Sequence, residues 1–184
     1  MADKPSYIGL LNAIANGERM GHKIFRNWAR VTTCDEIRGT LQTVAIREAE
    51  HAWAFEKRLC ELGFGLKPKE FPDLKKTLKI AKSDATDIEK LEQLGYGDKS
   101  KRGERGDELT KLLADTTIDP QTGALLGRFI CEERDTARRL KVCYQTLKGS
   151  GANPATEPNL EQLCTQLASL TEKVEAMTRL KAVR

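Results

Sequence analysis

The sequence predicts an all-α protein that consists of a four-helix bundle followed by a separate C-terminal helix. Apolar residues recur at spacings of three and four almost throughout the chain, which is the periodicity of amphipathic helices. Only 5% of the 184 residues are aromatic, and the alternation of β-branched residues typical of strands is scarce. A sheet is therefore disfavoured, and the chain is long enough for one bundle with a sizeable core.

Two long helices are predicted over about residues 6–31 and 35–62. Asp35 is expected to cap the second helix, and Gly63 supplies a stop signal after it. Trp53 is expected to lie in the core. The stripes predicted to face the core are Leu11, Ile14, Glu18, Gly21, Phe25 and Trp28 in the first helix, and Ile37, Leu41, Val44, Glu48, His51, Phe55, Leu59 and Leu62 in the second.

The segment that follows is less regular. It shows a weaker helical pattern over about residues 74–95, and then a glycine-rich, charged stretch at 95–107 that predicts a loop or a frayed helix. A short helix is predicted over about residues 108–116. A strong helix then covers about residues 120–149, with Asp119 as its cap and a proline in its first turn.

The C-terminal part is predicted to be separate from the bundle. Residues 1–149 would form the bundle, and the Gly/Pro-containing residues 150–158 a flexible linker. Residues 159–184 would form an amphipathic helix whose alternating 3-4 spacing is typical of a coiled coil. Either this helix pairs between chains, which gives a homo-oligomer, or it folds back onto its own bundle. The seam consists of Leu160, Leu163, Leu167, Leu170, Val174 and Met177.

An internal repeat supports a bundle of two helix pairs joined by a long crossover. Residues 32–41 match residues 116–125 without a gap. The same offset carries Glu48 onto Glu132, and His51 onto Asp135.

Three polar residues lie on the apolar stripes of the first two helices. Glu18 replaces an apolar residue in the first helix, and Glu48 and His51 replace two consecutive ones in the second. An ionised carboxylate in a bundle interior costs several kcal/mol unless it is paired, protonated or bound to a metal. Because residues three apart project to the same side of a helix, Glu48 and His51 can hold one ion together. Carboxylate and imidazole ligands suit iron or manganese.

With these residues, the chain over about residues 6–149 resembles the ferritin-like, rubrerythrin-type di-iron carboxylate proteins. The resemblance implies one glutamate and one Glu-x-x-His set from each half of the bundle. It also implies iron as the cofactor, with manganese possible, and oxidation chemistry with dioxygen or peroxide as substrate. No cysteine pairs of the rubredoxin kind are present.

The second half departs from that family pattern. It offers Glu132 and Asp135 where the family has Glu-x-x-His, and Glu104, in the glycine-rich stretch, is the candidate for the remaining ligand. The apolar stripe of this helix would instead bury Glu133 and Thr136, but we follow the repeat and expect Glu132 and Asp135 to face the site. Two irons or a single iron are both compatible with this set.

The main alternative is a metal-free scaffold or adaptor protein that oligomerises through its C-terminal helix. An arginine, Arg134, Arg138 or Arg139, paired with Asp135 would replace the metal. The net charge of +4 is too small, and its basic residues too interleaved with acidic ones, to favour nucleic acid as a partner. No run is apolar enough to predict a membrane span, and five cysteines without CxxC spacing favour reduced thiols and a cytoplasmic location.

Overall fold

The computed structural model describes residues 5–97 and 108–150, and all regular structure in these residues is helical. The chain divides into two compact units, residues 1–147 and 148–184. The elements in chain order are α1 (Ile8–Val31), α2 (Asp35–Glu61), α3 (Pro72–Ala81), α4 (Asp87–Gln93), the 3-10 helix η1 (Glu108–Leu113) and α5 (Pro120–Ser150).

The three long helices lie where the sequence predicts them, and the segments between them differ in detail. Asp35 is the first residue of α2, and the N-cap position is Cys34, so the prediction of Asp35 as a cap was wrong. The weak pattern over 74–95 forms two helices, because Thr86 begins α4 with a capping box closed by Glu89. No fourth long helix occurs in the described residues. The predicted linker beyond Ser150, the C-terminal helix and Glu104 lie outside them.

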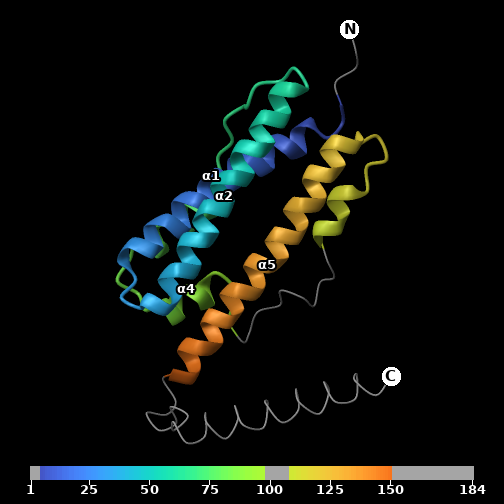
Figure 1. The fold of residues 1–184 in the computed structure, drawn as a ribbon. Helices are drawn as coiled ribbons and strands as arrows, with labels where there is room; N and C mark the ends of the chain where they lie inside the picture. Colours follow the sequence, from blue (N-terminus) through green and yellow to red (C-terminus); the bar gives the residue numbers. More distant parts are fainter. Residues whose placement is uncertain (1–4, 98–107, 151–184) are drawn as a thin grey trace, which may run out of the picture. The chain divides into compact units, whose positions relative to one another are not determined.

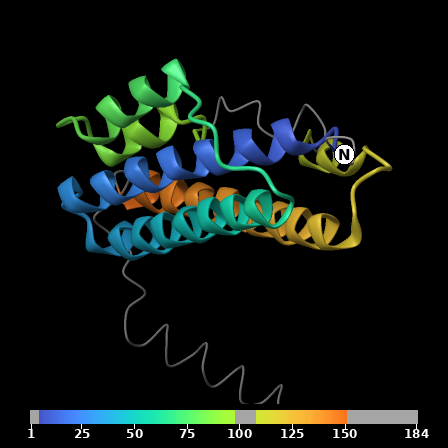
Figure 2. The ribbon, with the colours of Figure 1, turned by 90° about the horizontal axis from the view of Figure 1, so that it is seen from above.

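α1, α2 and α5 run side by side along their lengths, and α3 and α4 lie against one end of α1 (Figures 1 and 2). Asp87, the first residue of α4, accepts hydrogen bonds from Trp28 Nε1 and Thr32 Oγ1, both at 2.6 Å. Tyr144 on α5 donates to Glu92 Oε1 at 3.0 Å. α4 is therefore held by both α1 and α5.

The hydrophobic core consists of two clusters, one toward each end of the three long helices. The first cluster contains Ile24, Phe25, Trp28, Ala29, Ile37, Leu41, Val44, Ala45, Ala81, Leu91, Leu140, Cys143 and Tyr144. The second contains Tyr7, Ile8, Leu11, Ala15, Phe55, Leu59, Leu126, Phe129 and Ile130. On each long helix, the residues between the two clusters include acidic side chains. The side chains of Glu18, Glu48, His51, Glu132 and Glu133 form a polar layer that divides the core. The order of the residues in the two clusters shows that α2 runs antiparallel to α1 and α5.

The outer face of α2 carries two large apolar side chains. Trp53 is 67% exposed and Ile46 is 61% exposed, so the expectation that Trp53 fills the core was wrong. Ile46 and Trp53 are seven positions apart, about two helical turns, so both lie on the same face of α2, opposite His51 and Val44. No helix among the described residues is long and apolar enough to cross a membrane.

Asp119 joins all three long helices at one end of the molecule. Its carboxylate accepts hydrogen bonds from the backbone N–H and hydroxyl of Thr122, and so caps α5 as the sequence predicts. It also accepts from Arg58 Nη2 at 2.9 Å and from the Tyr7 hydroxyl at 2.7 Å. These contacts, the Thr122 hydroxyl first, hold the pKa of Asp119 well below its usual range.

We expect Asp119→Ala to lower the free energy of unfolding by about 2–4 kcal/mol, because it removes a cap and leaves the buried Arg58 with one partner fewer. Since the folded-state pKa is depressed, this stabilisation is present above about pH 4 and is lost as the pH falls below it. Urea unfolding at pH 7 and pH 3 measures both effects. The exposed Asp84→Ala serves as the control. An equal loss in both variants at pH 7 would contradict the role of Asp119.

Candidate metal centre

The polar layer brings acidic side chains from all three long helices to one histidine. Glu18 on α1 and Glu48 and His51 on α2 are buried, with exposed fractions of 9%, 6% and 3%. Glu132 and Glu133 reach the same level from α5 and are about three-quarters buried. The structure therefore places Glu18, Glu48, His51 and Glu132 together, as the sequence predicts.

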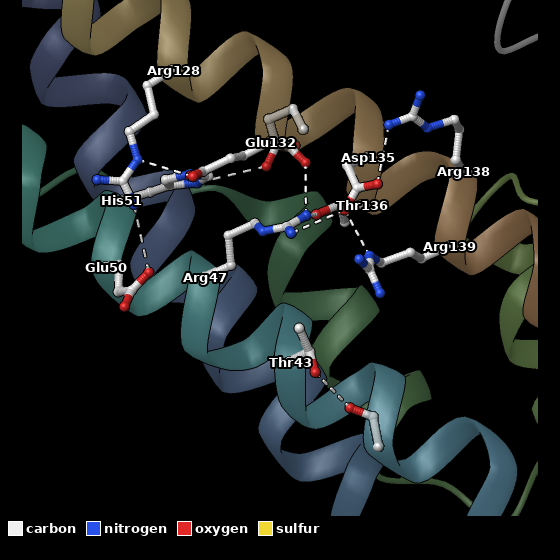
Figure 3. Close-up of polar contacts among 12 residues, drawn as sticks. Thr43, Arg47, Glu50, His51, Arg128, Glu132, Asp135, Thr136, Arg138 and Arg139 are labelled. Atoms are coloured by element: carbon white, nitrogen blue, oxygen red, sulfur yellow. Dashed lines mark hydrogen bonds and ion pairs between the residues drawn. The ribbon is translucent and has the colours of Figure 1, made fainter.

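Carboxylates lie against both ring nitrogens of His51. Its Nδ1 is 3.1 Å from Glu18 Oε2 and 3.7 Å from Glu133 Oε1. Its Nε2 is 2.6 Å from Glu132 Oε2, on the other side of the ring (Figure 3). The ring of Phe129 packs edge-on against the imidazole with a centroid separation of 5.1 Å. The orientation of His51 is thus set by packing and by Glu132, with Nδ1 directed at Glu18 and Glu133.

The carboxyl group of Glu48 lies close to that of Glu18, and each affects the pKa of the other. Burial, followed by the nearby charge of Glu133, raises the pKa of Glu18 to about 8. Burial and the charges of Glu18 and Glu133 likewise raise the pKa of Glu48 well above its usual value. Two carboxyl groups this close in a buried site ionise together only when a cation compensates them.

A glycine on α1 makes room for the Glu48 carboxylate. A Cβ atom at Gly21 would lie 2.0 Å from Glu48 Oε2 and 2.9 Å from its Cδ. By contrast, a Cβ atom at Gly17, one turn earlier, would meet no atom within 4 Å. The carboxylate of Glu48 therefore occupies the space that any side chain at position 21 would need.

Glu133 belongs to the group, although the repeat selected Glu132 and Asp135 as the residues facing the site. Thr136 is 3% exposed, whereas about a quarter of the Asp135 side chain remains exposed. The repeat thus selected Glu132 correctly, since it contacts His51 Nε2, but it was wrong for Asp135; the competing apolar stripe correctly predicted that Thr136 is buried. That stripe, Leu126, Phe129, Thr136 and Leu140, was the signal that could have identified Glu133.

The sequence repeat and the packing of the two helices differ by one residue. α2 begins at Asp35, but α5 begins at Pro120, one residue after the Asp119 that matches Asp35 in the sequence repeat. Counted from the first helical residue, Glu48 corresponds to Glu133, and His51 corresponds to Thr136. The second half therefore presents Glu-x-x-Thr to the interior.

Asp135 lies at the edge of the layer, among arginines. Its Oδ2 accepts hydrogen bonds from Arg47 Nη2 at 3.0 Å and from Arg139 Nε at 2.6 Å, and its Oδ1 accepts from Arg138 Nη2 at 3.0 Å (Figure 3). Arg139 and then Arg47 hold the pKa of Asp135 well below its usual range. The structure does not bring this carboxylate to His51 Nδ1. Glu104, the remaining predicted ligand, lies outside the described residues.

The residues present fit a divalent cation. Glu18, His51 and Glu133 offer donor atoms within 4.8 Å of one another, and the carboxyl group of Glu48 lies close enough to that of Glu18 to affect its pKa. Carboxylate oxygens with one imidazole nitrogen form the mixed ligand set that Fe²⁺ and Mn²⁺ accept. A 2+ charge would also compensate the buried carboxylates whose pKa values are raised.

A comparison of the chain with protein-family models, curated proteins and solved structures finds no match. The geometry of the polar layer is therefore the basis for assigning a function.

Proposed function

We propose that the protein binds a divalent metal ion, iron in the first place and manganese in the second, in a ferritin-like bundle. The observation that supports this most strongly is the group of Glu18 and Glu133 around His51 Nδ1, with the buried Glu48 carboxyl group beside Glu18, in a layer that divides the core. Three carboxyl groups and an imidazole at that depth are costly without a cation. The antiparallel α1 and α2, with a long connection from α2 to α5, agree with a ferritin-like topology.

Each residue has a distinct task in this proposal. Glu18, Glu48 and Glu133 would provide oxygen ligands, and His51 would provide Nδ1. Glu132 would not be a ligand, because it lies at Nε2, where it accepts the hydrogen bond that fixes the ring. Arg128 Nε donates to Glu132 Oε1 at 2.9 Å and so fixes the glutamate in turn. Iron held in this way supplies one-electron redox chemistry, with dioxygen or peroxide as the proposed substrate.

The buried carboxyl groups also have a task in metal uptake. Because Glu18 and Glu48 hold protons in the metal-free protein, binding a cation releases them, and the affinity rises with pH. The two hydrophobic clusters on either side of the layer keep bulk water from the carboxylates, which strengthens their attraction for a cation.

A metal-free scaffold is the second candidate, and the ion pairs of Asp135 favour it. Arg138 and Arg139, two of the arginines for which the sequence allows this pairing, bind the carboxylate, and Arg47 joins them. In that case the C-terminal residues 159–184 would mediate homo-oligomerisation. This remains a prediction, because these residues lie outside the described part of the chain.

Metal content separates the two candidates. We expect the purified protein, loaded anaerobically with ferrous iron and desalted, to retain iron in elemental analysis. Glu48→Ala and His51→Ala should each abolish retention and leave the helical circular dichroism signal largely unchanged. Glu50→Ala, an exposed acid on the same helix, is the control and should retain iron as the wild type does. A folded wild-type protein that retains neither iron nor manganese would exclude the metal-binding function.

A further inference from the structure

We infer that the centre holds a single metal ion. The Arg47 guanidinium occupies the position in which the second half of the bundle would hold a second metal ion. This inference rests on the proposed metal-binding function and specifies the stoichiometry of the site. It follows from the hydrogen-bond partners of three residues on α5, which are Thr136, Asp135 and Glu132.

Thr136 replaces the second histidine. It is the structural counterpart of His51 on α5, it is buried, and its hydroxyl accepts a hydrogen bond from Arg47 Nη1 at 2.9 Å. A neutral threonine hydroxyl is a much poorer ligand for Fe²⁺ or Mn²⁺ than an imidazole. The position that would hold a nitrogen ligand in the second half therefore binds a cationic side chain.

Both carboxylate oxygens of Asp135 accept hydrogen bonds from arginine side chains. Three guanidinium groups bind its two oxygens at 2.6–3.0 Å, two of them from α5 itself and one, Arg47, from α2. Charge-assisted hydrogen bonds of this kind are about twice as strong as neutral ones. A metal ion would have to displace at least one guanidinium to reach Asp135.

Glu132 has no oxygen left for a second ion. Its Oε1 accepts a hydrogen bond from Arg128 and its Oε2 lies 2.6 Å from His51 Nε2. Both oxygens thus serve to orient neighbouring side chains. In the first half-site, by contrast, the partner that Glu48 engages is another carboxyl group, Glu18.

Arg47 is fixed where it would repel a second cation. Its side chain is only 16% exposed, and besides Asp135 and Thr136 it donates to the Glu132 backbone carbonyl at 2.9 Å (Figure 3). These contacts hold a permanent positive charge between α2 and α5, beside the acidic group. Since arginine stays protonated at any working pH, a second divalent ion at this level would be repelled by three guanidinium groups that share the single negative charge of Asp135.

Anaerobic titration with Fe²⁺ and, separately, Mn²⁺ tests the inference by calorimetry and elemental analysis. We expect one ion per chain, and for Mn²⁺ a six-line electron paramagnetic resonance spectrum without the features of a coupled pair. Two ions per chain, or a coupled spectrum, would overturn the inference and leave the proposed function intact. No binding of either ion would overturn the proposed function itself.

A matched pair of variants on α5 tests which carboxylate is a ligand. We expect Asp135→Asn to keep one ion per chain with an affinity within about threefold of the wild type. Glu133→Gln, which is similarly conservative and lies two residues away, should weaken binding at least tenfold. Loss of the ion in Asp135→Asn, together with full binding in Glu133→Gln, would show that the repeat register defines the site and would refute the inference.

Discussion

Gly21→Ala is expected to weaken metal binding by about 100-fold or more, although it changes a residue that is not a ligand. A methyl group at this position would overlap the Glu48 carboxylate, which would have to turn away from Glu18. The loss cannot be attributed to the helix, because alanine favours a helix interior over glycine by about 1 kcal/mol. Calorimetric titration with Mn²⁺ measures the change in Kd.

Gly17→Ala is the matched control for this substitution. It adds the same methyl group to the same helix, one turn earlier, where no atom lies within 4 Å. We expect unchanged affinity and slightly higher stability. Equal affinities of the two alanine variants would show that Glu48 does not need its present position to bind the ion.

The metal-free protein is expected to lose stability as the pH rises from about 5 to 9. Burial and neighbouring charge raise the pKa of Glu18 to about 8, against an ordinary value of 4.5, and raise that of Glu48 as well. The folded state therefore binds these protons more tightly than the unfolded chain does. The stabilisation is complete below about pH 4.5 and is lost as the pH rises through the folded-state pKa values.

Glu48→Gln should remove much of this dependence, because the amide has nearly the same shape as the carboxyl group but cannot ionise. At pH 9, in the presence of a chelator, we expect the variant to be about 1–3 kcal/mol more stable than the wild type in urea unfolding. It should also fail to retain iron. Glu50→Gln, on the exposed face of α2, should change neither property. A wild-type stability that is constant between pH 5 and 9 would contradict this account of the polar layer.

The sequence predicts the parts of the site that lie within single helices. Glu18, Glu48 and His51 could be identified because each replaces an apolar residue on a stripe whose other members, such as Leu11 and Phe55, are buried. Such a substitution is visible in one helix without knowledge of its neighbours. For the same reason, the extents of α1, α2 and α5 follow from local periodicity and helix-terminal residues.

The contribution of α5 could be predicted only in part. Its apolar stripe gives the register and includes Glu133 and Thr136, but the sequence repeat, which is one residue out of step with that stripe, selected Asp135 instead. The partners of Asp135 depend on Arg47, which precedes it by almost half the chain and is brought close only by the packing of α2 on α5. Tertiary contacts of this kind leave no periodic signal in the sequence.

The polar layer has a consequence for how the molecule unfolds. The two apolar clusters lie on either side of the layer that contains Glu18, Glu48 and His51, so each cluster is only a part of the hydrophobic core. A ligand that binds the folded layer adds RT ln(1 + [L]/Kd) to the stability of both ends at once. Metal binding would then act as the source of cooperativity. With the ion, amide protons at both ends should exchange through one common opening, and without it the two ends can open separately.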